Sequence, residues 1–153
     1  MKYQMKKYYG ESLGRYIGHF YRQGQSFLIK EYKDLGFGAG QYQFLIMLYL
    51  KDGLSHDELT EKMSVDKATT TRAIIKLEEE GYVKRVLNEE DKRKYHIYLT
   101  EKAISKKEEV FRISDLWEQR LVGELTEEEK DALFLIMRKI ARNNPHYPFS
   151  EYQ

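Results

Sequence analysis

The 153-residue chain contains no cysteine and only two prolines. Without cysteine it can form neither a disulfide framework nor a thiolate metal site, and it cannot sense peroxide through a thiol. The longest apolar run, residues 44–50, is too short to span a bilayer. The N-terminus has no apolar segment of the kind that secretion signals carry. We therefore expect a cytoplasmic protein that makes no membrane contact.

No excess of one charge is present either. The 26 Lys and Arg residues almost balance the 25 Asp and Glu residues, which leaves a formal net charge of +1. A general affinity for polyanions is therefore not expected, and any contact with nucleic acid must come from a local basic patch. The length fits a single domain, with or without appended helices, that buries a real core.

Sequence patterns of enzymes are also missing. We find no nucleophile elbow and no phosphate-binding glycine loop, because the glycine-rich segment "GFGAG" (36–40) does not follow a strand. The histidines are scattered and show no metal-ligand spacing on one helix face; they are His19, His56, His96 and His146. We expect no catalytic activity, no cofactor and no metal site.

Helical patterns fill most of the chain. Apolar residues at spacings of three, four and seven predict a helix from Leu13 to Tyr32, and the segment 40–51, apolar almost all round, predicts a short buried helix. Ser55 and Glu58 have the spacing of a capping box before another short helix. After a tight turn, Asp66 is a good N-cap for a helix that ends near residue 81.

The hydrophobic period then changes from helix to strand. The segments "YVKRVL" (82–87) and "YHIYL" (95–99) predict a hairpin with a charged loop at residues 88–94. Thr100 is expected to cap a long helix, and a second capping box of Thr126 and Glu129 to start the last one. The tail from residue 143 contains both prolines and is expected to be extended.

The order of these elements is that of a helix-turn-helix with a two-stranded wing: short helix, turn, helix, strand, charged loop and strand. We expect a mainly α fold with a small β-wing, divided into an N-terminal dimerisation helix (1–36), a winged helix-turn-helix DNA-binding domain (37–100) and C-terminal dimerisation helices with a tail (101–153). The outer helices carry wide apolar stripes that pairing of two copies would bury. The alternative is that these helices fold back on their own chain.

The helix after Asp66 is suited to the DNA major groove, where the N-terminal residues of a recognition helix reach base edges. Small side chains at Ala68 and Thr69 can contact thymine methyl groups, and Arg72 can donate two hydrogen bonds to guanine. Lys67 and Lys76 suit phosphates, and Thr71 could serve either purpose. The alternative is a polar helix face without a ligand.

The charged loop of the predicted hairpin is suited to the minor groove. Over A·T-rich DNA this groove is narrow and strongly negative, and it attracts arginine. We expect Arg93 to enter it, Lys92 and Lys94 to contact flanking phosphates, and Asp91 to hold the guanidinium by accepting its hydrogen bonds. The alternative is an ordinary solvated turn.

Several stretches together resemble one known family. The segments "QYQFL" (41–45), "EL" (58–59), "SVDKATTTR" (64–72), "LEEEGYVKR" (77–85) and "DKR" (91–93) with the "LT" at 99–100 are similar to the MarR family of winged-helix transcription regulators. The resemblance runs from about residue 11 to about residue 142. It implies a homodimer that binds a palindromic operator, often with small-molecule relief of repression.

Position by position, the resemblance implies base reading by Ala68, Thr69 and Arg72, and a wing arginine at Arg93 braced by Asp91. It adds Arg85 as a basic position on the first wing strand, and we include Ser55, at the start of the short helix, among the expected DNA contacts. Gly38 and Ala68 depart from the family pattern, which commonly has threonine and serine there, so the operator sequence does not transfer.

The resemblance also implies a cavity between the dimerisation helices and the DNA-binding lobe. Arg15, Tyr16, His19 and Phe20 could line it and bind a small aromatic or lipophilic effector, although ordinary interface packing is the alternative. We therefore expect a sequence-specific regulator of transcription, a ligand-responsive repressor whose partner is double-stranded DNA. The alternative is a winged-helix module that binds protein and not DNA; it should lack the basic helix face or the basic loop that this chain has.

Overall fold

The computed structural model describes residues 10–143. Its elements are α2 (Leu13–Glu31), the 3₁₀ turn η1 (Lys33–Leu35), α3 (Tyr42–Leu50), β1 (Leu54–Ser55), α4 (His56–Met63), α5 (Lys67–Glu79), β2 (Val83–Leu87), β3 (Tyr95–Leu99), α6 (Glu101–Val122) and α7 (Glu127–Arg142). The expected extended tail lies almost entirely outside the described residues. Within residues 10–143, no helix combines the length and the apolar character that crossing a membrane requires.

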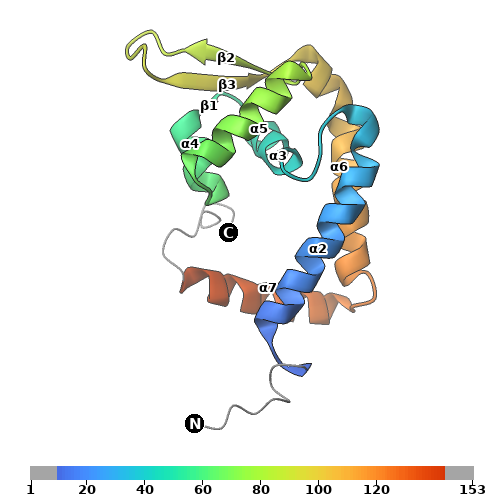
Figure 1. The fold of residues 1–153 in the computed structure, drawn as a ribbon. Helices are drawn as coiled ribbons and strands as arrows, with labels where there is room; N and C mark the ends of the chain where they lie inside the picture. Colours follow the sequence, from blue (N-terminus) through green and yellow to red (C-terminus); the bar gives the residue numbers. More distant parts are fainter. Residues whose placement is uncertain (1–9, 144–153) are drawn as a thin grey trace.

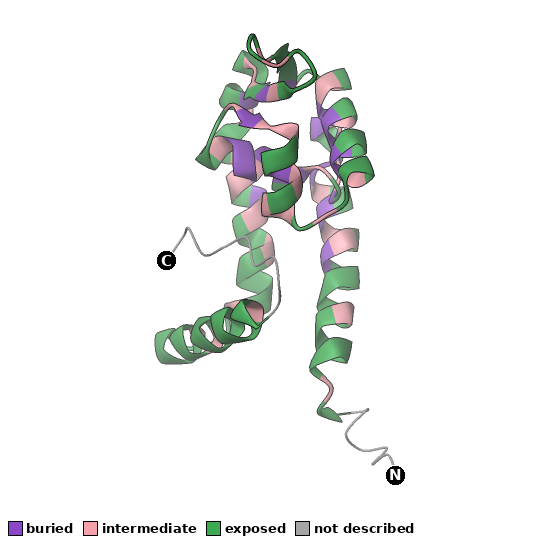
Figure 2. Cartoon of the chain, turned by 90° about the vertical axis from the view of Figure 1, so that its left-hand side faces the viewer, coloured by how far each residue is buried: buried purple, intermediate pink, exposed green. Residues whose placement is uncertain are grey.

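The elements form a lobe and a helical extension. Helices α3, α4 and α5 and the small sheet make up the lobe, while α2 and α6 pack against each other and lead away from it to α7 at the far end (Figure 1). Buried residues gather in the lobe and the adjoining parts of α2 and α6, whereas α7 is almost entirely exposed (Figure 2). The expected mainly α fold with a small β-wing is confirmed.

The sheet has three antiparallel strands in the order β1–β3–β2. Strands β2 and β3 form the expected hairpin, with Val83 opposite Leu99 and Leu87 opposite Tyr95. The two-stranded wing is thus present, but the sheet has a third strand that was not expected, because Leu54 of β1 pairs with the other edge of β3. A strand of two residues has no periodicity to recognise, and its pairing depends on where α3 and α4 place it beside a segment more than forty residues later.

The core of the lobe is built around α3, as its apolar sequence predicts. Leu45 and Leu48 have no exposed surface, and Phe44 is 2 % exposed. Buried tyrosines complete this core with satisfied hydroxyl groups: Tyr32 donates to the carbonyl oxygen of Val110 at 2.9 Å, which ties α2 to α6. Burial also raises the pKa of the Tyr32 phenol, so this donor keeps its proton.

The predicted helix starts are all present. Ser55 accepts a hydrogen bond from the Glu58 N–H at 3.1 Å and donates its own N–H to the Glu58 carboxylate at 2.7 Å, which completes the capping box. Asp66 accepts the Thr69 N–H at 2.6 Å at the start of α5. Thr100 caps α6, and Thr126 with Glu129 forms the capping box of α7. These local bonds fix where α4, α5, α6 and α7 begin, whereas α3 starts at Tyr42 without a side-chain cap.

The end of α5 gives a test of the fold. Gly81 has φ +79°, and a Cβ there would meet only the side chain of Lys102 at 3.7 Å, so a substitution is opposed by backbone strain and not by lack of space. We expect Gly81→Ala to lower the free energy of unfolding by about 1–2 kcal/mol. Urea denaturation followed by circular dichroism measures this change.

The matched control is Gly40→Ala, because Gly40 has no atom within 4 Å of the added Cβ and no positive φ. We expect this variant to unfold within about 0.5 kcal/mol of the parent. Equal destabilisation by both substitutions would contradict the assignment of strain to Gly81.

Candidate nucleic-acid interface

Helix α5 divides into a buried side and an exposed side. Its buried residues follow one stripe and are, in order, Thr70, Ala73, Ile74 and Leu77. The side opposite this stripe carries most of the residues expected to read DNA: Lys67, Ala68, Thr71 and Arg72 are exposed, and Thr69 is half-buried. Packing of α5 against α4 and α3 therefore turns the N-terminal half of the predicted recognition surface toward solvent.

Polar side chains on the exposed side of α5 form hydrogen bonds with one another and with His56 of α4. The Arg72 guanidinium donates to the Thr69 hydroxyl at 3.1 Å. The Thr71 hydroxyl donates to the Lys67 carbonyl oxygen at 2.8 Å and lies 3.0 Å from Nε2 of His56 on α4. Since Thr71 has already used its one hydrogen, Nε2 of His56 must be the donor. Thr71 can then only accept a further hydrogen bond from a ligand.

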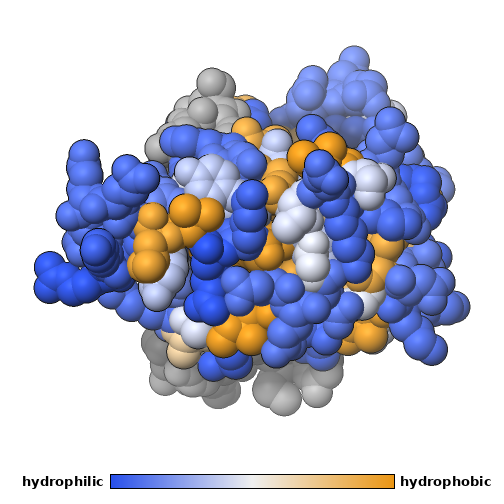
Figure 3. All heavy atoms as spheres, turned by 90° about the horizontal axis from the view of Figure 1, so that it is seen from above, coloured by the Kyte–Doolittle hydropathy of each residue, from blue (hydrophilic) through white to orange (hydrophobic). Residues whose placement is uncertain are grey.

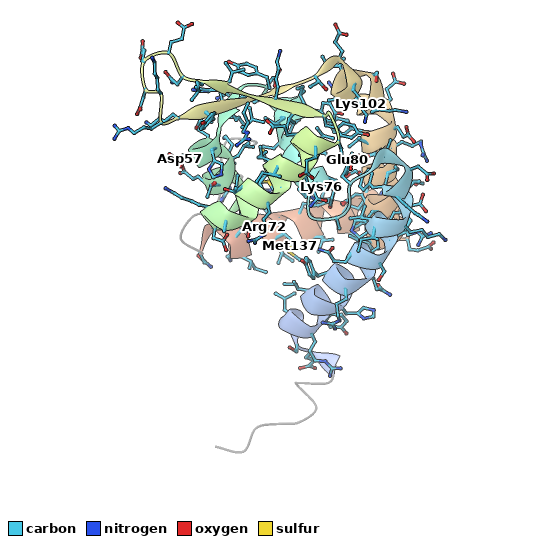
Figure 4. All side chains as sticks on the ribbon, turned by 45° about the horizontal axis from the view of Figure 1, so that its top comes forward. Asp57, Arg72, Lys76, Glu80, Lys102 and Met137 are labelled. Atoms are coloured by element: carbon cyan, nitrogen blue, oxygen red, sulfur yellow. The ribbon has the colours of Figure 1, made fainter. Side chains whose placement is uncertain are left out.

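The two lysines of α5 have carboxylate neighbours. Lys67 lies 3.7 Å from Asp57, with both side chains mostly exposed, and Lys76 donates to Glu80 at 2.9 Å. The hydrogen bond from Lys76 to Glu80 raises the pKa of Lys76. Arg72, Lys76 and Glu80 follow one another along α5 (Figure 4). Positive charge on this helix is therefore least compensated near its N-terminal half.

The wing loop presents its arginine to solvent. The Arg93 side chain is 92 % exposed, and Asp91 accepts hydrogen bonds from both its backbone N–H at 3.1 Å and its Nε at 3.3 Å. The neighbouring Lys92 and Lys94 are exposed as well. The contact expected between Asp91 and Arg93 is thus present, and it orients the guanidinium without burying it.

Arg85 has a partner that the sequence reading did not anticipate. Its Nε and Nη2 donate to the two oxygens of Glu78 at 3.0 and 2.9 Å, and its guanidinium carbon lies 5.6 Å from the centre of the Tyr95 ring. The hydrogen bonds from Arg85 lower the pKa of Glu78. This bidentate pair ties strand β2 to helix α5. Ser55 is likewise occupied, because its hydroxyl oxygen caps α4.

The N-terminal end of α5 and the wing loop point toward the same side of the molecule, at the left of the view (Figure 1). Seen over the sheet, the surface is mainly hydrophilic, with apolar atoms confined to separate patches (Figure 3). Exposed cations on α5 and on the loop are therefore available to one extended polar ligand. A continuous apolar docking face is not seen at this end.

The four residues expected to bind an effector lie together on α2 and border two hollows. Arg15, Tyr16 and His19 line an open hollow of about 510 Å³ on α2, but Phe20 does not. Phe20 instead borders a hollow of about 290 Å³ between α2, α3 and α6, together with Trp117 and Tyr42. The Phe20 ring also stacks on Tyr16, with ring centroids 6.2 Å apart, and lies 5.8 Å from the His19 ring, so the effector site on these four residues stays a prediction. Trp117 was missed because its position depends on the α2–α6 packing.

Two histidines proved structural where the sequence reading considered them only as metal ligands. His56 bonds to Thr71 on α5, while His96 donates from Nδ1 to the carbonyl oxygen of Gly53 and places Nε2 3.2 Å from the side-chain nitrogen of Asn88. Among residues 10–143, no group of three or more His, Cys, Asp or Glu side chains is placed to hold a metal ion.

Comparisons with known proteins point to one family. Residues 38–95 match the model of the MarR family. The HTH-type transcriptional regulator YybA of Bacillus subtilis is 30 % identical over 129 residues, which cover 84 % of this chain and 86 % of YybA. A MarR transcriptional regulator from Methanosarcina mazei Go1 superposes with a TM-score of 0.81 at 34 % identity, covering 86 % of this chain and 94 % of that one.

A mutant MarR from E. coli, solved in complex with operator DNA, is also similar in structure. It superposes with a TM-score of 0.74 at 26 % identity and covers 84 % of this chain and 92 % of its own. The similar proteins thus include one whose structure was determined on DNA.

The Glu78–Arg85 pair predicts a pH-dependent contribution to stability. Because the pKa of Glu78 is lowered, the pair stabilises the fold above the ordinary glutamate pKa of about 4.3, and this contribution is lost as the pH falls through the folded-state pKa. Both side chains are more than a third exposed, so we expect Glu78→Gln to cost only about 0.5 kcal/mol near neutral pH.

Urea unfolding at fixed protein concentration, repeated from about pH 7 downward, measures this difference. Glu89→Gln, at an exposed carboxylate of the wing loop, is the control and should change little. A difference between Glu78→Gln and the parent that persisted in acid would rule out the ion pair as its source.

Proposed function

The chain belongs to the MarR family of transcriptional regulators, and from that membership we propose that it binds double-stranded DNA sequence-specifically as a homodimer. One observation carries the proposal: an exposed, cation-bearing half of α5 and an arginine-tipped wing loop lie toward the same side of the lobe. The operator-bound relative from E. coli supports the same use of this fold.

In the proposed complex, α5 lies in the major groove. Ala68 and Thr69 contact thymine methyl groups, and Arg72 donates to guanine once its bond to Thr69 is exchanged for the base. Thr71, whose hydroxyl can only accept, favours an amino group of adenine or cytosine. The supporting phosphate contacts come from residues at the edges of this surface, which are Ser55, Lys67, Lys76 and Arg85.

The wing loop occupies the neighbouring minor groove. Arg93 enters it with its guanidinium oriented by Asp91, while Lys92 and Lys94 reach the flanking phosphates. Asp91 engages only Nε of the guanidinium, so the terminal nitrogens of Arg93 can donate to acceptors in the groove while the Asp91 contact is kept. The wing thereby adds a preference for A·T-rich flanks.

Homodimerisation is proposed from the apolar surface that a single chain leaves uncovered. No residue of α7 (Glu127–Arg142) is buried, although its Leu135 and Ile136 are large and apolar. On α2, Tyr16 and Ile17 are about half exposed. A second copy that covers both helices would bury this surface, and the resulting two-fold axis implies a palindromic operator.

A ligand-responsive repressor is the form of regulation we propose. A dimer that occupies operator DNA blocks other proteins from the same duplex, and the hollow between α2, α3 and α6 has aromatic walls for a small aromatic or lipophilic effector. One of its walls is α2, which also carries part of the proposed dimer surface, so an occupant can change the spacing of the two lobes.

Two arginine variants test the DNA-binding surface. We expect Arg72→Ala to weaken binding by about 1–3 kcal/mol and to relax base preference at one position of each half-site. Arg93→Ala should weaken binding about tenfold and reduce the preference for A·T-rich flanks. Selection from a random DNA pool followed by fluorescence anisotropy measures both effects.

Arg112→Ala, at an exposed arginine of α6, is the matched control and should bind as the parent does. If the parent itself shows no salt-dependent, sequence-preferring binding, the chain is instead a winged-helix module for protein partners. Unchanged affinity of Arg93→Ala would remove the wing from the interface.

A charge placed on α7 tests the dimer. Leu135 is 64 % exposed in the single chain, and we expect Leu135→Glu to give a monomer at micromolar concentration, because a buried unpaired carboxylate opposes association. Ile104→Glu is the control, because Ile104 is similarly exposed (62 %) but lies near the start of α6, at the end of the lobe. Light scattering that shows a monomeric parent, or a dimeric Leu135→Glu, would contradict this assignment.

A further inference from the structure

The wing loop is held by a chain of hydrogen bonds that starts outside the hairpin. The carbonyl oxygen of Gly53, just before β1, lies 2.9 Å from Nδ1 of His96 on β3. Nε2 of His96 lies 3.2 Å from the side-chain nitrogen of Asn88. The Asn88 side-chain oxygen accepts the N–H groups of Glu90 at 2.8 Å and of Asp91 at 3.2 Å. Asp91 then holds Arg93, so the chain ends at the wing arginine.

Only one protonation state satisfies every bond in this chain. A carbonyl oxygen can only accept, so Nδ1 of His96 must carry a hydrogen. The Asn88 oxygen is engaged by two backbone N–H groups, so its NH₂ group faces His96 and needs an acceptor. Nε2 must therefore be bare, which makes the imidazole neutral.

We propose that His96 and Asn88 are positioning residues for Arg93, and that they hold the wing in its DNA-binding form only while His96 is neutral. This inference rests on the proposed DNA-binding function, because it concerns how the wing arginine is aimed. Neither residue needs to touch DNA; both act through the backbone of the loop that carries Asp91 and Arg93.

Protonation of His96 breaks this arrangement. Both ring nitrogens become donors, and Nε2–H then confronts the NH₂ group of Asn88. The amide cannot turn round to offer its oxygen without withdrawing it from Glu90 and Asp91. The DNA-binding form is thus the deprotonated form, and affinity falls as the pH is lowered and the imidazole gains its second N–H.

Charged groups around His96 leave the sign of this effect unchanged. Glu58 of α4 is close enough for His96 to help lower its pKa, but its carboxylate is occupied by the Ser55 N–H. Asp52, before β1, accepts the Leu99 N–H at 2.8 Å. On β2, Val86 pairs with His96. Lys84, two residues before Val86, lies on the same face of the strand. None of these groups gives Nε2–H an acceptor where Asn88 lies.

The test compares affinities on both sides of the imidazole range. His56 is a second imidazole at the proposed DNA surface, where it bonds to Thr71, so the parent for this experiment is His56→Gln, whose amide can still donate to Thr71. The probe is a fluorescein-labelled duplex selected from a random pool by the unaltered chain. In this parent, we expect affinity to be roughly 2- to 10-fold weaker at about pH 6 than at about pH 8, the range for loss of one hydrogen bond.

Two variants of that parent separate positioning from mere structural support. Adding His96→Gln should make affinity independent of pH over this range. Adding Asn88→Asp should reverse the trend, because a carboxylate at this position accepts a hydrogen bond from the protonated ring. The added negative charge weakens DNA binding at both pH values, so each variant is judged by the ratio of its affinities at the two pH values. A parent without pH dependence, or one whose trend survives His96→Gln, would overturn the proposal.

A measurement without DNA distinguishes failure of this inference from failure of the proposed function. In ¹H–¹⁵N spectra of the parent, the side-chain amide of Asn88 and the backbone amides of Glu90 and Asp91 should shift with one midpoint, that of the His96 ring. Amide signals that stay unmoved while the ring titrates would refute the hydrogen-bond chain. Shifting signals with unaltered DNA affinity would instead show that the wing does not aim an arginine at DNA.

Discussion

The orientation of α5 is the constraint on which the proposed function depends. Its buried stripe, from Thr70 to Leu77, packs against the lobe, and Thr70 is fully buried yet satisfied, because it lies 2.8 Å from the Thr60 hydroxyl of α4. A polar group in this place fixes the crossing of α4 and α5, since an unpaired buried hydroxyl would be costly. A rotation of α5 that brought Arg72 into the buried stripe would turn Ile74 out of it. The exposed side is therefore determined by the core, before any ligand is present.

Acidic neighbours explain how the proposed DNA-binding surface coexists with a net charge of only +1. Lys67, Lys76, Arg85 and Arg93 each lie beside a carboxylate of the same lobe. The pairs of Lys67 and Lys76 are substantially exposed, so they contribute little to stability and can be exchanged for phosphates at small cost. The Arg85–Glu78 pair differs because it is bidentate and joins two elements. It suits a role in holding the wing against α5.

Local signals in the sequence predicted local structure well. The capping box at Ser55, the N-cap at Asp66 and the stop at Gly81 are interactions between residues close in the chain, and all three are present in the structure. What the sequence could not show depends on distant segments meeting. Strand β1 exists because β3 lies beside it, and the bonds of His96 link positions 53, 88 and 96. A histidine in an alternating strand gives no sign of which carbonyl it will reach.

The joint between α2 and α6 determines what an effector at these helices can do. Tyr32 bonds the carbonyl of Val110, and a Cβ on Gly24 would lie 2.9 Å from the Trp117 ring, so the two helices are in close contact at two levels. Sliding one past the other would break a buried hydrogen bond and open a gap beside the indole. Helix α6 also packs on α3 and β3. In the proposed dimer, an effector would therefore move each lobe with its α2–α6 pair as one body, changing the distance between the two α5 helices and leaving each reading surface intact.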